Sequence, residues 1–304
     1  KGLSEWIKNS IAAYVRAGTP IEKQTIFLRF SDSETGNAVM ECIDFVGMNS
    51  EQIVIAFKRW GDPKAAQYGY SATKRVPGGH GNGGKFYMRQ MFKESYFVTY
   101  KEGKLSIYGF SPNRKYGFAN GMKDVAMSPE AALKQADITD VPIPQDTLNM
   151  ILEGKTGFTV VRGISPIGMV NKVQTSRICE KLKNYPQVRK HLERINTLVI
   201  HNGKILNRLI PEKLDAKEGF EDPVVIEIPE TLSYSEGGEK HDVVMFNNKY
   251  PKGKLILKTS AEALERGGRL GELNRVDIYA NTEPIASYYM YEFGVSLYSQ
   301  SVFI

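Results

Sequence analysis

The sequence is poor in cysteine, lacks long apolar runs and carries little net charge. Among 304 residues only Cys42 and Cys179 are cysteines, so no disulfide framework is indicated and a reduced, cytoplasmic setting is expected. No apolar stretch approaches the ~20 residues of a membrane helix, and no signal peptide is visible, so no membrane partner is expected. The four histidines show no metal-ligand spacing. A net charge of +6 permits nucleic-acid contact but is too small to indicate it.

The length and composition are those of a globular chain. With 41% hydrophobic and 24% charged residues, 304 residues can bury one large core or two ordinary ones. The first residue is Lys1 rather than Met, and the chain stops in the apolar segment 301–304. We therefore expect a piece of a longer protein.

The most informative stretch is a glycine-rich loop, Pro77–Met88. Five glycines lie within residues 78–84, so the backbone can take positive φ angles and approach a ligand closely. The residues that follow, 85–96, contain no Gly or Pro and have large side chains at helical spacing. A loop that runs into a helix N-terminus suits a phosphate group. The alternative is a flexible surface loop.

This loop is neither of the two most familiar phosphate loops. Gly79 to Lys85 nearly matches G-x-x-x-x-G-K-[ST], but Phe86 occupies the position of the metal-binding hydroxyl. A dinucleotide fingerprint does not fit either, because the loop is not the first turn of a βαβ unit.

The first segment predicts an amphipathic helix over residues 2–16, and Gly18 is the signal that terminates it. On its polar face, Glu5 and Asn9 lie one turn apart, so a carboxylate and an amide are side by side. Such a pair is either a solvated surface or a site in which the carboxylate activates water and the amide oxygen holds a metal ion. The apolar stripe consists of Leu3, Ile7, Ile11, Tyr14 and Val15.

Two strands are predicted next, over residues 25–30 and 38–45. Asp44 lies at the end of the second strand, before Gly47 and Met48. It is either a turn former or a buried acceptor for an exocyclic amine. A helix is predicted to begin at Asn49 with a capping box that includes Gln52, and to continue to Trp60.

Together these motifs resemble three successive nucleotide-binding boxes of the GHKL superfamily, which includes gyrase, heat-shock chaperone ATPases, histidine kinases, MutL and MORC proteins. The boxes are Glu5-x-x-x-Asn9, Asp44-x-x-Gly47-Met48 and Gly79-x-Gly81-x-Gly83-Gly84-Lys85. Their order, spacing and context fit, and the Gly-Met followed by a helix is most similar to the chaperone and MORC branches.

The resemblance implies a role for each matched residue. Glu5 is implied to be the general base, and Asn9 the Mg²⁺ ligand. Asp44 is implied to accept the adenine amino group. The segment 60–79 is implied to be a mobile ATP lid. The remaining implied nucleotide-binding residues are Gly47, Met48, Gly79, Gly81, Asn82, Gly83, Gly84 and Lys85.

The chain departs from the family pattern in two boxes. The second box usually reads Asp-x-Gly-x-Gly, whereas the spacing from Asp44 to Gly47 is one residue shorter and lacks the first Gly. The last box usually reads Gly-Thr-x-Val, and its threonine position falls on Phe158. We assign the hydroxyl to Thr156, and so place this residue in the nucleotide site. The alternatives are that Thr159 supplies the hydroxyl, or that this segment is only a core strand.

The fold that the resemblance implies is α+β: a Bergerat-type α/β sandwich that binds ATP, at residues 1–206, followed by a smaller β-rich α/β domain at 207–304 that resembles the transducer domain of several family branches. Hairpins are predicted about Glu102-Gly103 and Asn202-Gly203, and helices near 147–153, 171–182 and 187–195. Residues 119–144 read as an insertion that covers the site. Strand candidates in the second domain are 224–228, 243–247, 253–259 and 275–279.

The predicted function is Mg²⁺-dependent ATP binding and slow hydrolysis that drives a conformational switch in a larger protein. The cofactors are ATP and Mg²⁺, and ATP-dependent homodimerisation and an unidentified client are the implied partners. Two alternatives remain open: histidine-kinase-like phosphotransfer, which usually lacks the water-activating Glu, and a non-catalytic module that binds phosphate or nucleic acid.

Overall fold

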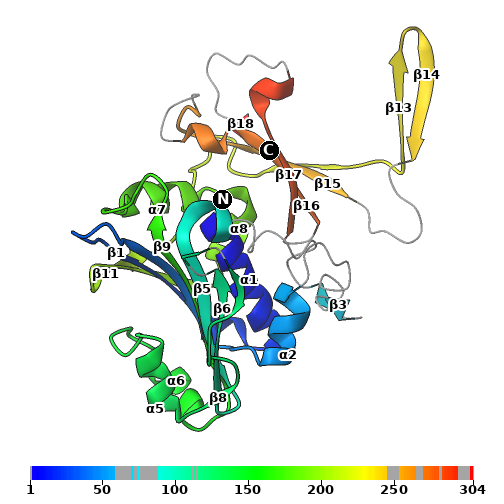
Figure 1. Ribbon diagram of the computed structural model, residues 1–304. Coiled ribbons are helices and arrows are strands. Elements are labelled where there is room, and N and C mark those ends of the chain that lie inside the picture. The colour runs from blue at the N-terminus through cyan, green and yellow to red at the C-terminus, as the bar shows by residue number, and fades with distance from the viewer. Residues whose placement is uncertain are drawn as a thin grey trace. The chain divides into compact units, whose positions relative to one another are not determined.

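The computed structural model describes residues 2–58, 70–71, 74–75, 88–110, 112–113, 115–244, 253–264, 270–280, 283–293 and 302–303. The chain divides into two compact units, Lys1–Pro211 and Glu212–Ile304 (Figure 1). Helices combine with mixed and antiparallel sheets, so the predicted α+β class is confirmed. The assignment of domains at 1–206 and 207–304 stays a prediction.

The first unit is built around a sheet that has nine strands within the described residues, in the order β11-β10-β1-β2-β9-β5-β6-β7, with β8 paired to β6. The β1–β10 pair is parallel, and every other pair of this sheet is antiparallel. The strands are β1 (Thr25–Ser31), β2 (Val39–Asp44), β5 (Phe92–Lys101), β6 (Lys104–Phe110), β7 (Tyr116–Phe118), β8 (Val125–Ala126), β9 (Phe158–Pro166), β10 (Asn196–His201) and β11 (Lys204–Arg208).

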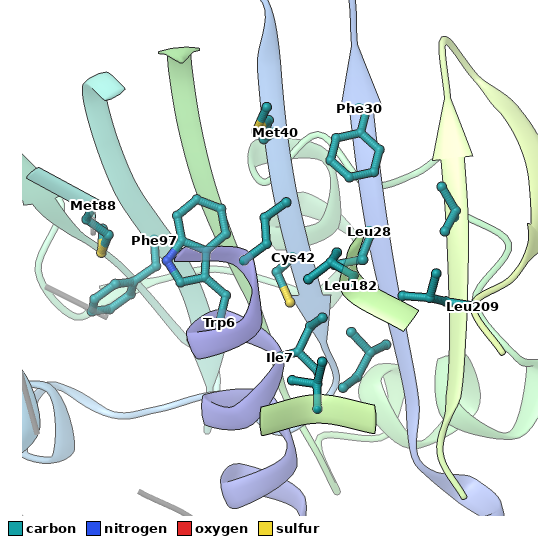
Figure 2. Close-up of a cluster of buried hydrophobic side chains, with 14 of the residues drawn as sticks. Trp6, Ile7, Leu28, Phe30, Met40, Cys42, Met88, Phe97, Leu182 and Leu209 are labelled. Atoms are coloured by element: carbon teal, nitrogen blue, oxygen red, sulfur yellow. The ribbon is translucent and has the colours of Figure 1, made fainter. Parts of the chain in front are cut away.

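One face of this sheet is covered by α1 (Gly2–Ala17), α7 (Thr175–Lys183) and α8 (Pro186–Leu192). Trp6 and Ile7 of α1 point toward the sheet, where Leu28 of β1 and Cys42 of β2 meet them (Figure 2). All four side chains are buried. The predicted apolar stripe of the first helix is therefore confirmed as the surface that fixes α1 to the sheet.

The opposite face is covered by α5 (Pro129–Gln135) and α6 (Gln145–Leu152), which lie on the side of the sheet away from α1 (Figure 1). Phe27, Ile43 and Val160 point to this side. Because both faces are covered, β1 and β2 are buried almost continuously instead of at alternate residues. The predicted insertion at 119–144 therefore does not cover the face from which Asp44 projects, and this expectation is wrong.

A buried charge cluster lies on the α5 side. Glu41 accepts hydrogen bonds from Arg29 and from Arg162. Arg29 also donates to Asp140 at 2.8 Å and to the carbonyl of Asp137 at 2.6 Å. The cluster joins β1, β2 and β9 to the segment after α5.

The helix predicted over residues 85–96 is wrong beyond residue 91. Residues 88–91 are helical, but β5 begins at Phe92 and pairs with β9 and β6 on its two sides. The two ladders of backbone hydrogen bonds override the helical spacing of the side chains.

Local turn and cap signals are confirmed. Asn49 caps α2 (Ser50–Ile53) in a capping box with Gln52, although the chain continues as a π-helix, η2 (Val54–Lys58), rather than as an α-helix. The hairpin turns place residues 102–103 and 202–203 at positive φ, as predicted. Minor elements are η1 (Ile21–Lys23), β3 (Tyr70–Ser71) and β4 (Lys74–Arg75).

The second unit is rich in β-structure, as predicted, and has a small described core of Leu264, Leu270 and Leu273. Among the described residues, no helix of the chain has the length and apolarity to cross a membrane. The strands are β12 (Val224–Glu227), β13 (Thr231–Glu236), β14 (Glu239–Val244), β15 (Lys254–Thr259), β16 (Arg275–Ala280), β17 (Glu283–Tyr289) and β18 (Val302–Phe303), with 3₁₀ turns η3 (Gly271–Leu273) and η4 (Met290–Phe293).

Candidate nucleotide site

Helix α1 carries the first two predicted site residues on its partly exposed side. The Glu5 carboxylate is 20% exposed and lies 3.9 Å from the ammonium of Lys8. Asn9 is exposed, and its amide makes no hydrogen bond to other described residues. A carboxylate and an exposed amide are thus presented one helical turn apart.

Asp44 ends β2 and points toward α1. Its side chain is buried, and its Oδ2 accepts a hydrogen bond of 2.8 Å from the hydroxyl of Ser10. Its Oδ1 accepts a hydrogen bond of 3.3 Å from the backbone N–H of Val46. Ser10 follows Asn9 directly, so α1 and the end of β2 bring the first and second predicted boxes together.

Burial dominates the electrostatics of this carboxylate. Loss of water raises the pKa of Asp44 to about 6, against the opposing effects of the Ser10 and Val46 hydrogen bonds and the positive charge of Arg16. Above that pH the carboxylate is ionised and can only accept hydrogen bonds. A buried acceptor of this kind suits an amino group.

The raised pKa predicts how stability depends on pH. Protonated Asp44 contributes stability that is fully present below about 3.8 and is lost as the pH rises through about 6. At about 1.4 kcal/mol per pKa unit, the free energy of unfolding should fall by up to about 3 kcal/mol from this group. Asp44→Asn keeps an acceptor for Ser10 but has no carboxylate to ionise. Its free energy of unfolding relative to the parent should therefore be higher at pH 8 than at pH 4, as measured by urea unfolding.

The control for this experiment is Glu34→Gln, at an exposed turn of the same unit. Its stability relative to the parent should be nearly the same at both pH values. An Asp44→Asn difference that does not change between pH 4 and pH 8 would contradict the raised pKa.

The turn after Asp44 is packed directly on β5. Gly47 has a φ of +76°, and a Cβ built there would lie 2.2 Å from the carbonyl oxygen of Tyr100. The next residue, Met48, donates its backbone N–H to the hydroxyl of Thr99 at 2.7 Å. Only glycine fits at Gly47 without displacing backbone, so this residue sets the position of the Gly-Met pair.

The strand register aligns two threonines in a row with Asp44 across the sheet. In β9, Thr159 is the direct partner of Asp44, and in β5, Thr99 is the direct partner of Thr159. Directly opposed residues project from the same face of a sheet, here toward α1. The hydroxyl of Thr156 instead donates to the carbonyl of Phe45 at 2.7 Å. The role assigned to Thr156 stays a prediction, and Thr159 is the threonine that the register places next to Asp44.

The third predicted box lies outside the described residues. This applies to Gly79, Gly81, Asn82, Gly83, Gly84 and Lys85, and to most of the predicted lid. No group of three or more His, Cys, Asp or Glu side chains in the described ranges could hold a metal ion.

Sequence reasoning missed two polar residues of this site. Ser10 is buried and lies one helical turn from the apolar residues Ile7 and Tyr14. A serine within an apolar stripe is a usable signal for a buried hydrogen-bond partner. Thr99 gives no comparable signal, because threonine is common in strands and its partner Thr159 is 60 residues away.

Comparison with known proteins gives only distant similarity. No protein-family model matches the sequence, and no curated protein matches it. The B-subunit of DNA gyrase from Myxococcus xanthus aligns with a TM-score of 0.40 and 8% identity, over 92% of this chain and 65% of that chain. The 43K ATPase domain of Thermus thermophilus gyrase B, in complex with an aminocoumarin, aligns with a TM-score of 0.39 and 12% identity, over 92% and 60%.

A third solved structure, the N-terminal domain of a DNA repair protein, aligns with a TM-score of 0.41 and 12% identity, over 94% of this chain and 73% of that chain. The chain thus spans less than two thirds of the length of the two gyrase structures.

Proposed function

We propose that this chain binds ATP with Mg²⁺ in a GHKL-type site and hydrolyses it slowly, as a conformational switch within a longer cytoplasmic protein. The observation that carries the proposal is the hydrogen bond from Ser10 to buried Asp44. It joins the end of β2 to the helix that presents Glu5 and Asn9. An acceptor for a nucleobase, Asp44, is therefore held against the same helix that carries the candidate groups for phosphate chemistry.

The base end of the proposed site is Asp44. Its ionised carboxylate would accept a hydrogen bond from the exocyclic amino group of adenine. The turn at Gly47-Met48 follows Asp44 in the chain. An amino group is favoured because both carboxylate oxygens are acceptors that burial has removed from water.

The phosphate end lies toward the start of α1. Glu5 precedes Ser10 by five residues, or about 7.5 Å along a helix axis. A nucleotide held at Asp44 can therefore extend along α1, past Asn9, toward Glu5. The glycine loop at residues 78–84 is proposed to surround the phosphates with backbone N–H groups.

Hydrolysis in this proposal needs two functions from the chain. Asn9 would hold Mg²⁺ through its exposed amide oxygen, and the ion would supply charge neutralisation for the phosphates. Glu5 would take a proton from the attacking water. The switch follows if ATP and ADP stabilise different conformations of the chain, and ATP-dependent dimerisation is one form of such a switch.

The direct test is thermal unfolding with nucleotide. At about a hundredfold excess over the dissociation constant, ATP with Mg²⁺ should add roughly 2.7 kcal/mol to the free energy of unfolding, which raises the Tm by several degrees. ATP with excess EDTA should give a smaller shift. No shift with any nucleotide at millimolar concentration would overturn the proposed function.

A further inference from the structure

Thr99 is fully buried, and its hydroxyl makes several contacts at the site. The backbone N–H of Met48 donates to it at 2.7 Å. The carbonyl oxygen of Phe158 and the hydroxyl of Thr159 each lie 3.1 Å away. The carbonyl oxygen of Met48 is farther, at 3.4 Å. Thr99 thus links the Gly-Met turn, β5 and β9.

The hydrogen-bonding capacity of a hydroxyl limits how these contacts are made. A hydroxyl has one proton to donate and two lone pairs with which to accept. The Met48 N–H occupies one lone pair of Thr99. The nearer carbonyl, that of Phe158, can only accept, so it takes the Thr99 proton. The remaining lone pair of Thr99 faces Thr159, which must therefore donate its own proton to Thr99.

This arrangement fixes the direction of the Thr159 hydroxyl. With its proton committed to Thr99, the oxygen of Thr159 has only lone pairs left for another group. Thr159 is 5% exposed and Asp44 4%, whereas Thr99 is at 0%. A ligand bound at Asp44 would therefore meet two acceptors on neighbouring strands, the Asp44 carboxylate and the Thr159 hydroxyl oxygen.

We propose that Thr99 is a positioning residue that sets the base specificity of the site, by holding Thr159 as an acceptor beside Asp44. The proposal rests on the nucleotide-binding function proposed above. Two neighbouring acceptors favour a purine with an amino group at C6. They disfavour a purine with a carbonyl at C6, whose lone pairs would face theirs.

The test compares the binding of ADP and inosine diphosphate, which differ at C6 and are not substrates for hydrolysis of a γ-phosphate. Calorimetric titration with Mg²⁺ at pH 8 keeps Asp44 ionised. The parent should prefer ADP by about a hundredfold. Thr99→Val keeps the branched shape but frees the Thr159 proton, which can then be donated to a carbonyl, so the preference should fall about tenfold. Thr99→Ser should restore it.

Thr159→Val is the second variant, because it leaves the bond between Thr99 and Met48 in place. Thr159→Val should also lower the preference for ADP over inosine diphosphate. If Thr99→Val does not fold, this variant tests the inference by itself. General damage to the site would weaken both nucleotides equally, so an unchanged ratio in folded Thr99→Val or Thr159→Val overturns the inference. If the parent binds neither nucleotide, the proposed function itself fails.

Discussion

Glu5→Ala should lower the rate of ATP hydrolysis roughly 10²–10⁴-fold while leaving ATP affinity close to that of the parent. Loss of a general base typically costs this much, because the base acts on the attacking water only in the transition state. The Glu5 side chain is 20% exposed, and its carboxylate lies 3.9 Å from the ammonium of Lys8. Phosphate release under saturating ATP and equilibrium titration measure the two quantities separately.

Two further variants sharpen this experiment. Glu5→Gln keeps the shape of the side chain but cannot take a proton, so it should be as slow as Glu5→Ala. Asp44→Asn presents an N–H group to the adenine amine, and an unmet buried partner costs about 1–3 kcal/mol, so affinity should fall roughly ten- to a hundredfold. Hydrolysis by Glu5→Ala at the parent rate would show that Glu5 is a solvated helix residue.

Gly47→Ala should destabilise the first unit by about 3 kcal/mol or more. The left-handed conformation costs a non-glycine residue roughly 1–2 kcal/mol, and forcing an atom into a packed position costs about 1–3 kcal/mol further. The clash is with the backbone oxygen of Tyr100, 2.2 Å from the new Cβ, and backbone in a central strand cannot rotate away. Urea unfolding measures the loss.

Gly103 provides a matched control for this substitution. Its φ of +73° is nearly that of Gly47, but a Cβ there meets no atom within 4 Å. Gly103→Ala should therefore show only the conformational cost, and the difference between the two variants isolates the close packing of the Gly-Met turn on β5. Equal losses in the two variants would mean that the turn can move away from Tyr100.

Much of the fold follows from local signals in the sequence. The apolar stripe of α1, the capping box at Asn49 and the Asn202-Gly203 turn each act within a few residues, and the structure confirms all three. The segment 92–96 was predicted as helix because large residues recur at helical spacing. Its strand state is imposed by pairing with β9, which lies more than 60 residues later in the chain.

The site divides along the same line. Glu5, Asn9 and Asp44 could be proposed from sequence because each belongs to a short motif. The positions of Thr99 and Thr159 relative to Asp44 depend on the register of three strands that are distant in sequence, and no local pattern encodes that register. The contact of Ser10 with Asp44 likewise depends on how α1 packs on the sheet.

The parallel pairing of β1 with β10 has a consequence for biosynthesis. Residues 25–30 find one of their two neighbouring strands only at residues 196–201. As the ribosome releases the chain from its N-terminus, α1 and the β1–β2 pair emerge long before β9 and β10 are available to cover their open edges. The candidate nucleotide site therefore cannot assemble until most of the first unit has been translated, and closing such distant contacts slows folding. During this interval the strand edges are exposed, and we expect the nascent protein to depend on chaperones.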